Sequence, residues 1–182
     1  MEAGLSISVR LARPEDAPDI GAVHVAAWRS AYAGILSEAT LTGMSVLRQG
    51  IYYETMIRRH GGVFVAVAGS PEQVIGFASI GRERRSALHE GEIHTLYVLD
   101  DWREAGVGRQ LMQAAASTLA ADGCQSAFLW VLADNPSRWF YHHLGGRATA
   151  TGSTRVGGES VAQTRYAWDP MKTLIDSTSS QS

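Results

Sequence analysis

Hydrophobic and polar residues alternate near the start of the chain and then change to a helical spacing. Ile7 and Val9 are separated by polar residues, which is typical of a strand with one buried face. From Pro14 to Trp28 apolar residues recur every three or four positions, and proline is tolerated in the first turn of a helix. The chain is therefore expected to open with a strand over Ser6–Arg13 and a helix after it.

The remaining pattern predicts a mixed α/β protein. Runs that favour strands occupy Val63–Ala68, Val74–Gly81, Glu92–Leu99, Ala127–Leu132, Thr154–Val156 and Ser160–Trp168, with a hairpin turn at Gly157-Gly158. Helical spacing covers Leu41–Arg59, interrupted at Gly43 and Gly50, then Gly106–Ala121 and Pro136–Leu144. This order predicts one mixed, mostly antiparallel sheet with flanking helices. A strand–helix–strand crossover over Glu92–Leu132 is expected at its centre.

No repeat and no second domain is visible, so residues 1–170 are expected to form one domain. After Pro170 the chain is rich in serine and threonine, and residues 171–182 are expected to be a flexible tail. Cys124 is the only cysteine and is expected to be a structural thiol.

Composition narrows the function classes. Apolar residues make up 45% of the chain and charged residues 19%, as in globular proteins. Sixteen basic residues face eighteen acidic ones, so there is no basic excess for binding nucleic acid. No apolar run is long enough to cross a membrane, and the N-terminus does not resemble a signal peptide. With a single cysteine, these features predict a cytoplasmic protein without membrane or nucleic-acid partners.

A glycine-containing loop joins a predicted strand to the longest uninterrupted predicted helix. Gly106 and Gly108 let a ligand approach the first N–H groups of that helix, which favour an anion such as phosphate. Arg103 and Arg109 can add charge-assisted hydrogen bonds. A dinucleotide fingerprint would need glycine where Leu111 stands, and there is no P-loop. The glycines alone fit either phosphate binding or a simple tight turn.

Two motifs together resemble the GNAT superfamily of N-acetyltransferases. Arg103-x-x-Gly106-x-Gly108 is similar to its Gln/Arg-x-x-Gly-x-Gly/Ala motif. The segment Asn135–Gly145, with Phe-Tyr at its centre, is similar to Asn-x-x-Ala-x-x-Phe-Tyr-x-x-x-Gly-Phe. Their order and separation fit the family, and the resemblance extends over most of the chain. It implies the GNAT fold, acetyl-CoA as cosubstrate and a homodimer.

The resemblance also implies which residues contact the coenzyme. The pyrophosphate would be held by Arg103, Glu104, Ala105, Gly106, Val107, Gly108 and Arg109, the thioester and pantetheine would meet backbone N–H groups near Leu96 and Val98, and Asn135 would complete this site. The chain departs from the family at Asp100, Glu104, Arg138 and Gly146. Of these, Glu104 adds an acid beside the phosphates.

Transfer without an acyl-enzyme needs a general acid and a base. Tyr141 matches the family tyrosine that protonates the departing sulfur, although it could also be a core residue. Glu92 and His94 are two apart on a predicted strand, so they are expected to share a face with Leu96 and Val98. Glu92 is the candidate base and His94 the alternative. Glu92 could also merely hydrogen-bond the strand opening.

No metal is expected. The run from His89 to His94 nearly matches His-Glu-x-x-His, but its second histidine comes one position late and the segment is a predicted strand.

Two aromatic residues are the candidate acceptor site. Trp28 and Tyr32 are four apart on a helix and share a face. They resemble a Trp-x-x-x-Tyr-x-Gly segment of one GNAT branch, with Ser37 where that branch has proline. Such rings can receive a small primary amine, or they can simply pack the helix on the sheet. A non-catalytic acetyl-CoA sensor and a protein N-terminal acetyltransferase are the alternatives. A toxin acting on aminoacyl-tRNA is disfavoured by the absent basic excess.

Overall fold

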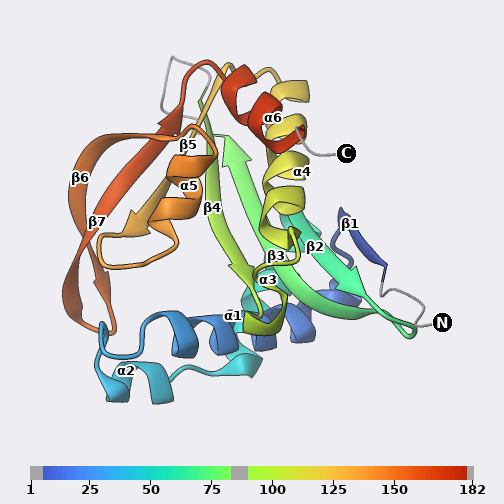
Figure 1. The fold of residues 1–182 in the computed structure, drawn as a ribbon. Coiled ribbons are helices and arrows are strands. Elements are labelled where there is room, and N and C mark those ends of the chain that lie inside the picture. Colours follow the sequence, from blue (N-terminus) through green and yellow to red (C-terminus); the bar gives the residue numbers. More distant parts are fainter. Residues whose placement is uncertain (1–5, 83–89, 180–182) are drawn as a thin grey trace.

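The computed structural model describes residues 6–82 and 90–179, and its centre is a seven-stranded sheet (Figure 1). The strands are β1 (Ile7–Leu11), β2 (Val63–Ala68), β3 (Gln73–Arg82), β4 (Glu90–Val98), β5 (Ser126–Leu132), β6 (Arg147–Val156) and β7 (Glu159–Trp168). Their order is β1-β2-β3-β4-β5-β7-β6, and only β4 and β5 run parallel among the paired strands. The predicted mixed, mostly antiparallel sheet with one central crossover is confirmed.

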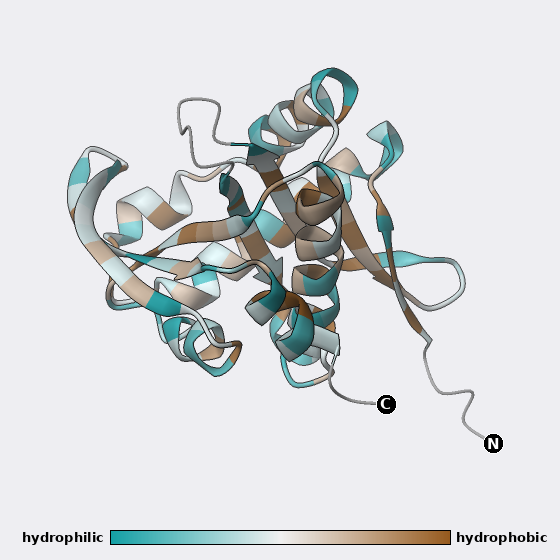
Figure 2. Ribbon diagram, turned by 90° about the horizontal axis from the view of Figure 1, so that it is seen from above, coloured by the Kyte–Doolittle hydropathy of each residue, from teal (hydrophilic) through white to brown (hydrophobic). Residues whose placement is uncertain are grey.

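Helices cover both faces of the sheet. They are α1 (Ala17–Ala31), α2 (Glu38–Thr42), α3 (Val46–Arg59), α4 (Val107–Ala121), α5 (Arg138–His143) and α6 (Lys172–Ser179), with short 3₁₀ turns η1 (Pro14–Asp16) and η2 (Asp100–Trp102). One buried cluster joins α1 and α3 to β2 and β3, and a larger one lies on the opposite face against α4 and α6. Figure 2 shows the apolar segments gathered on the strands and on α4.

Of the two interruptions predicted in the second helical region, one is absent and one is present. The helix does not break at Gly50, which lies inside α3. A Cβ atom on Gly21 would come within 2.7 Å of the Gly50 nitrogen, so glycine lets α1 and α3 cross closely. The chain does break at Gly43, which separates α2 from α3.

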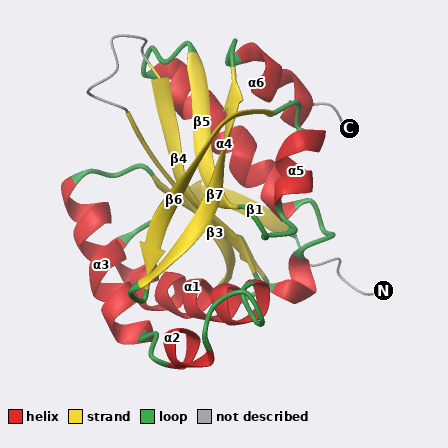
Figure 3. Cartoon of the chain, turned by 90° about the vertical axis from the view of Figure 1, so that its left-hand side faces the viewer, coloured by secondary structure: helices red, strands yellow, loops and turns green. Residues whose placement is uncertain are grey.

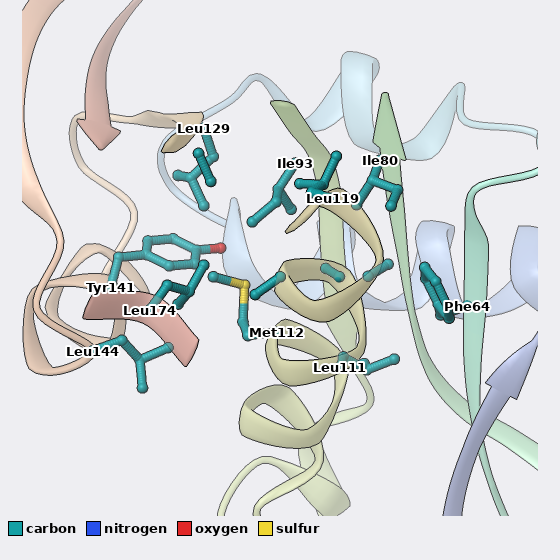
Figure 4. Close-up of a cluster of buried hydrophobic side chains, with 14 of the residues drawn as sticks. Phe64, Ile80, Ile93, Leu111, Met112, Leu119, Leu129, Tyr141, Leu144 and Leu174 are labelled. Atoms are coloured by element: carbon teal, nitrogen blue, oxygen red, sulfur yellow. The ribbon is translucent and has the colours of Figure 1, made fainter. Parts of the chain in front are cut away.

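The last helix corrects the prediction of a flexible tail from residue 171. Leu174 is fully buried on α6 and packs in the same cluster as Met112 and Leu144 (Figure 4). The Ser177 hydroxyl donates to the Leu144 carbonyl at 2.8 Å. The domain therefore continues through α6, because the apolar face of this helix is buried against the core. The polar composition of the segment concealed this face in the sequence.

The sheet opens at its centre. β4 and β5 pair only at Glu90–Ser126, Gly91–Ala127 and Glu92–Phe128, and beyond these three rungs they diverge. On one side of this gap, β6 and β7 form a long hairpin whose turn reaches α2 (Figure 3). Glu159 at that turn accepts a hydrogen bond from the Thr40 hydroxyl at 3.2 Å. β6 is longer than predicted, since this edge strand is largely exposed and carries no apolar alternation.

Candidate functional site

A cavity of about 530 Å³ lies where β4 and β5 diverge. Its wall combines the C-terminal end of α1, the diverging parts of β4 and β5, the start of α4, α5 and the β6–β7 hairpin. Eight predicted site residues line it, namely Trp28, Tyr32, Leu96, Val98, Arg103, Gly108, Asn135 and Tyr141. The fold thus brings together residues that are far apart in the sequence.

The start of α4 forms one end of this wall and is suited to binding an anion. Gly106 caps the helix with φ +76°, and a side chain there would point into open space. The first N–H groups, from Val107 onward, have no acceptor within the helix, so they can bind an anion. Arg103 lines the cavity, and its guanidinium is oriented by Asp100 at 2.8 Å. The arrangement fits a pyrophosphate.

The other predicted pyrophosphate residues are not among those that line the cavity. The Arg109 guanidinium donates to the Ser177 carbonyl on α6, and Arg109 does not line the cavity. The Val107 side chain is fully buried beneath the helix start. Glu104 and Ala105 are exposed in the loop and do not line the cavity.

Tyr141 lines the cavity from α5 and is 6% exposed. Its ring packs at an angle against Tyr166 and edge-on against Trp168. Figure 4 shows the ring reaching from α5 toward α4, with its hydroxyl at the far end. Burial, followed by the charge of a Tyr32 phenolate, raises the pKa of Tyr141 above its ordinary value. The phenol is therefore protonated at neutral pH.

Tyr32 connects the two candidate subsites. It directly follows α1 and is 3% exposed, and its ring meets Trp28 edge-on at 4.7 Å. Asn135 donates from Nδ2 to the Tyr32 hydroxyl at 3.1 Å, and its Oδ1 accepts from the Ser137 N–H at 2.9 Å. Tyr32 is thus both a packed residue and part of the cavity wall.

The strand that carries Glu92 corrects one prediction. The pairing of β3 with β4 shifts between Ser79–Thr95 and Ile80–Ile93, which leaves His94 as an extra residue in a bulge. Ile93 therefore shares the α4 face with Leu96 and Val98. Glu92, adjacent to Ile93, points to the opposite face, because the bulge reverses the alternation.

Glu92 and His94 nevertheless remain close to each other. The Glu92 carboxylate lies 3.5 Å from His94 Nδ1. His94 belongs to the cavity wall, whereas Glu92 does not. The imidazole lies over Gly81, where a Cβ atom would come within 2.5 Å of Nε2. The geometry therefore makes His94 at least as strong a candidate base as Glu92.

Comparison with known proteins decides the family. The family model described as "Acetyltransferase (GNAT) family" matches residues 25–145, which include the cavity wall from Ala27 to Tyr141. The chain belongs to the GNAT family. The N-acetyltransferase YuaI of Bacillus subtilis is 31% identical over 174 residues, covering 93% of this chain and 99% of that protein. This GNAT protein is an acetyl-CoA-dependent N-acetyltransferase.

Solved GNAT structures share its fold. An acetyltransferase of Salmonella typhimurium, solved with its cofactor acetyl-CoA, has a TM-score of 0.66 at 18% identity and covers 90% of this chain and 94% of its own. The PaiA N-acetyltransferase of Thermoplasma acidophilum, in complex with coenzyme A, has a TM-score of 0.65 at 20% identity, covering 88% and 99%. The likeness confirms the predicted GNAT fold.

Sequence reasoning missed a buried histidine in this GNAT domain. His24, Trp28 and Tyr32 follow one another at four-residue spacing, and His24 stacks on Trp28 at 5.4 Å. His24 Nδ1 lies 2.8 Å from the Tyr53 hydroxyl, and burial lowers its pKa to about 4. The only sequence signal was a histidine among the apolar positions of a helix.

Two further observations on the described residues concern metal-binding groups and membrane-spanning helices. Residues 6–82 and 90–179 contain no group of three or more His, Cys, Asp or Glu side chains arranged to hold a metal ion. His89 of the near-miss zinc motif lies outside these ranges. Within the same ranges, no helix is long and apolar enough to cross a membrane.

Proposed function

We propose that this GNAT protein moves the acetyl group of acetyl-CoA to a small primary amine by direct attack in a ternary complex. The observation that carries the proposal is the shared cavity. One 530 Å³ space is lined by Gly108 at the start of α4, by the diverging β4 and β5, and by the Tyr141 phenol. A coenzyme with its pyrophosphate on α4 would direct its thioester into the gap, within reach of the phenol.

Three side chains take part in the proton transfers that acetyl transfer requires. The ammonium form of the amine first gives a proton to the Glu92–His94 pair. The free amine nitrogen then bonds to the thioester carbon, the carbon–sulfur bond breaks, and Tyr141 gives its proton to the departing sulfur. The second proton, which the nitrogen loses as it becomes an amide, restores the Tyr141 phenol through solvent. In this scheme His94 lies in the cavity wall, and Glu92, at 3.5 Å, stabilises its protonated form. Glu92 acting through a water is the second route.

The acceptor is proposed to enter beside the rings of Trp28 and Tyr32. These side chains line the cavity, and aromatic faces attract an ammonium or an apolar amine. A relative from Pseudomonas aeruginosa supports a small acceptor. It is 32% identical over 120 residues, covering 65% of this chain and 67% of that protein, and is named L-methionine sulfoximine/L-methionine sulfone acetyltransferase.

A panel of amines tests the proposal. Release of coenzyme A thiol from acetyl-CoA would be followed with L-methionine sulfone, simple alkyl and aryl amines, and peptides with free N-termini. Turnover with a small primary amine is expected. Turnover with peptides alone would favour an N-terminal acetyltransferase. Binding of acetyl-CoA without thiol release for any amine would favour a sensor and contradict catalysis.

A further inference from the structure

Arg165 lies at the closed end of the gap, beside the last paired residues of β4 and β5 before the two strands diverge. It is on β7 opposite Trp130, and its guanidinium lies 4.2 Å over the ring of Phe128. Phe128 forms the last rung between β5 and β4, where it pairs with Glu92. The side chain therefore crosses β5 at the point of divergence.

The guanidinium is fixed at both ends. It donates from one terminal nitrogen to the Glu90 carboxylate on β4 at 2.9 Å, and from the other to the Thr149 hydroxyl on β6 at 3.0 Å. The Arg165 and Glu90 side chains are 19% and 21% exposed, so this ion pair is largely removed from water. A planar, forked cation suits such simultaneous contacts with a carboxylate and a ring.

Within the described residues, the ladder between β4 and β5 is short. Parallel pairing extends over only three rungs, whereas β3 and β4 pair over most of their lengths. On the α4 face Leu119 packs directly on Gly91, so an ion pair on the opposite face clamps the same rungs from the other side. Loosening this clamp would let β4 move relative to β5 and would change the width of the gap.

We propose that Arg165, acting through Glu90 and Phe128, is a positioning residue that sets the width of the gap for the thioester. The inference rests on the proposed function, in which the gap receives the acetyl end of acetyl-CoA. Arg165 is not among the residues that line the cavity, so its effect is carried by the strands.

The experiment compares two ligands by calorimetry in Arg165→Met, Glu90→Gln and the double variant. Acetyl-CoA reaches into the gap, whereas 3′-phosphoadenosine 5′-diphosphate occupies only the α4 end. Each single variant is expected to raise the Kd of acetyl-CoA about tenfold and to change the Kd of the diphosphate by no more than about twofold. A tenfold change lies within the usual range of interaction energies between residues in contact. The Kd of acetyl-CoA for the double variant is expected to equal that of the single variants, because both substitutions remove the same ion pair.

Arg10→Met is the matched control. Arg10 forms a similarly sheltered ion pair with Asp16 at 2.7 Å, but it lies on β1 at the far edge of the sheet. The Arg10→Met variant is expected to have a lower Tm and an unchanged Kd for both acetyl-CoA and the diphosphate. Unchanged acetyl-CoA affinity in Arg165→Met and Glu90→Gln, equal losses for both ligands, or additive losses in the double variant would overturn the clamp. Failure of the unmutated protein to bind either ligand would instead contradict the proposed coenzyme site.

Discussion

At the scale of single residues, Tyr141 gives the sharpest test of the chemistry. Its buried phenol keeps its proton at neutral pH and lines the gap. Tyr141→Phe is expected to leave acetyl-CoA affinity unchanged and to lower kcat by about 10²–10⁴-fold, the usual contribution of general acid catalysis. Tyr166→Phe is the matched control, since Tyr166 is a buried neighbour that does not line the cavity. A Tyr141→Phe rate within a few-fold of the original would remove the phenol from the mechanism.

The pH dependence of the rate tests whether Glu92 and His94 act as the base. A base is needed most at neutral pH and least at high pH, where free amine is already plentiful. His94→Ala is therefore expected to lose most activity near pH 7 and to recover as pH rises, and Glu92→Gln is expected to show the same trend less strongly. A loss that is uniform across pH in both variants would show that the pair only positions other groups.

His24 makes stability depend on pH. A histidine in the unfolded chain titrates near pH 6.5, whereas the folded pKa is about 4. Between these values the unfolded chain binds the proton and the folded one does not, so stability falls as pH drops. The free energy of unfolding is expected to fall by about 2 kcal/mol from pH 7 to pH 5 through this group.

Urea denaturation of the original protein and His24→Phe at both pH values measures this contribution. The variant is expected to lose that part of the pH dependence. Tyr53, the partner of His24, also hydrogen-bonds to Thr95, so its hydroxyl keeps a partner in the variant. Identical pH dependence in the two proteins would mean that His24 is protonated in the folded state.

At the scale of elements, the start of α4 is the proposed site of the coenzyme pyrophosphate. Gly108→Glu adds a negative charge at the proposed pyrophosphate site, and its Cβ atom would meet the Phe140 ring at 3.2 Å. The Kd for acetyl-CoA is expected to rise at least about a hundredfold, since like charge and bulk oppose the same ligand. Gln113→Glu adds the same charge on the exposed middle of α4 and serves as control. Equal affinity in the two folded variants would place the pyrophosphate elsewhere.

Helix α6 is expected to be part of the folded core. Leu174→Ala would leave a cavity beside Met112 and Leu144, and it is expected to lower the free energy of unfolding by about 2–5 kcal/mol. Thr173→Ala on the exposed side of the same helix should change it little. Comparable small effects of both substitutions in chemical denaturation would mean that α6 is dispensable.

The elements differ in how far the sequence predicts them. Alternation and helical spacing predict the sheet, α1 and α4, because these elements bury one regular face. The bulge at His94 depends on the register with β3, and no pattern within β4 reveals it. That single extra residue turns Glu92 away from Leu96 and Val98. Helix α6 was missed because its few apolar residues stand in a serine-rich segment.

At the scale of the whole molecule, the sheet assembles a site that no single segment contains. The motif residues Gly108 and Tyr141 could be found in the sequence, since each has its own pattern. Their convergence on one cavity with Trp28 and Tyr32 depends on the divergence of β4 from β5, and this is a property of the folded sheet. The Arg165–Glu90 ion pair joins residues 75 positions apart, which spacing alone cannot reveal.

A crystal structure of the complex with coenzyme A would test the site most directly. The pyrophosphate is expected on the backbone N–H groups of Val107, Gly108 and Arg109, with the pantetheine between β4 and β5. The sulfur is expected within hydrogen-bonding distance of the Tyr141 hydroxyl. A coenzyme bound away from the start of α4, or one whose sulfur lies outside the gap and out of reach of Tyr141, would contradict the proposed site and mechanism.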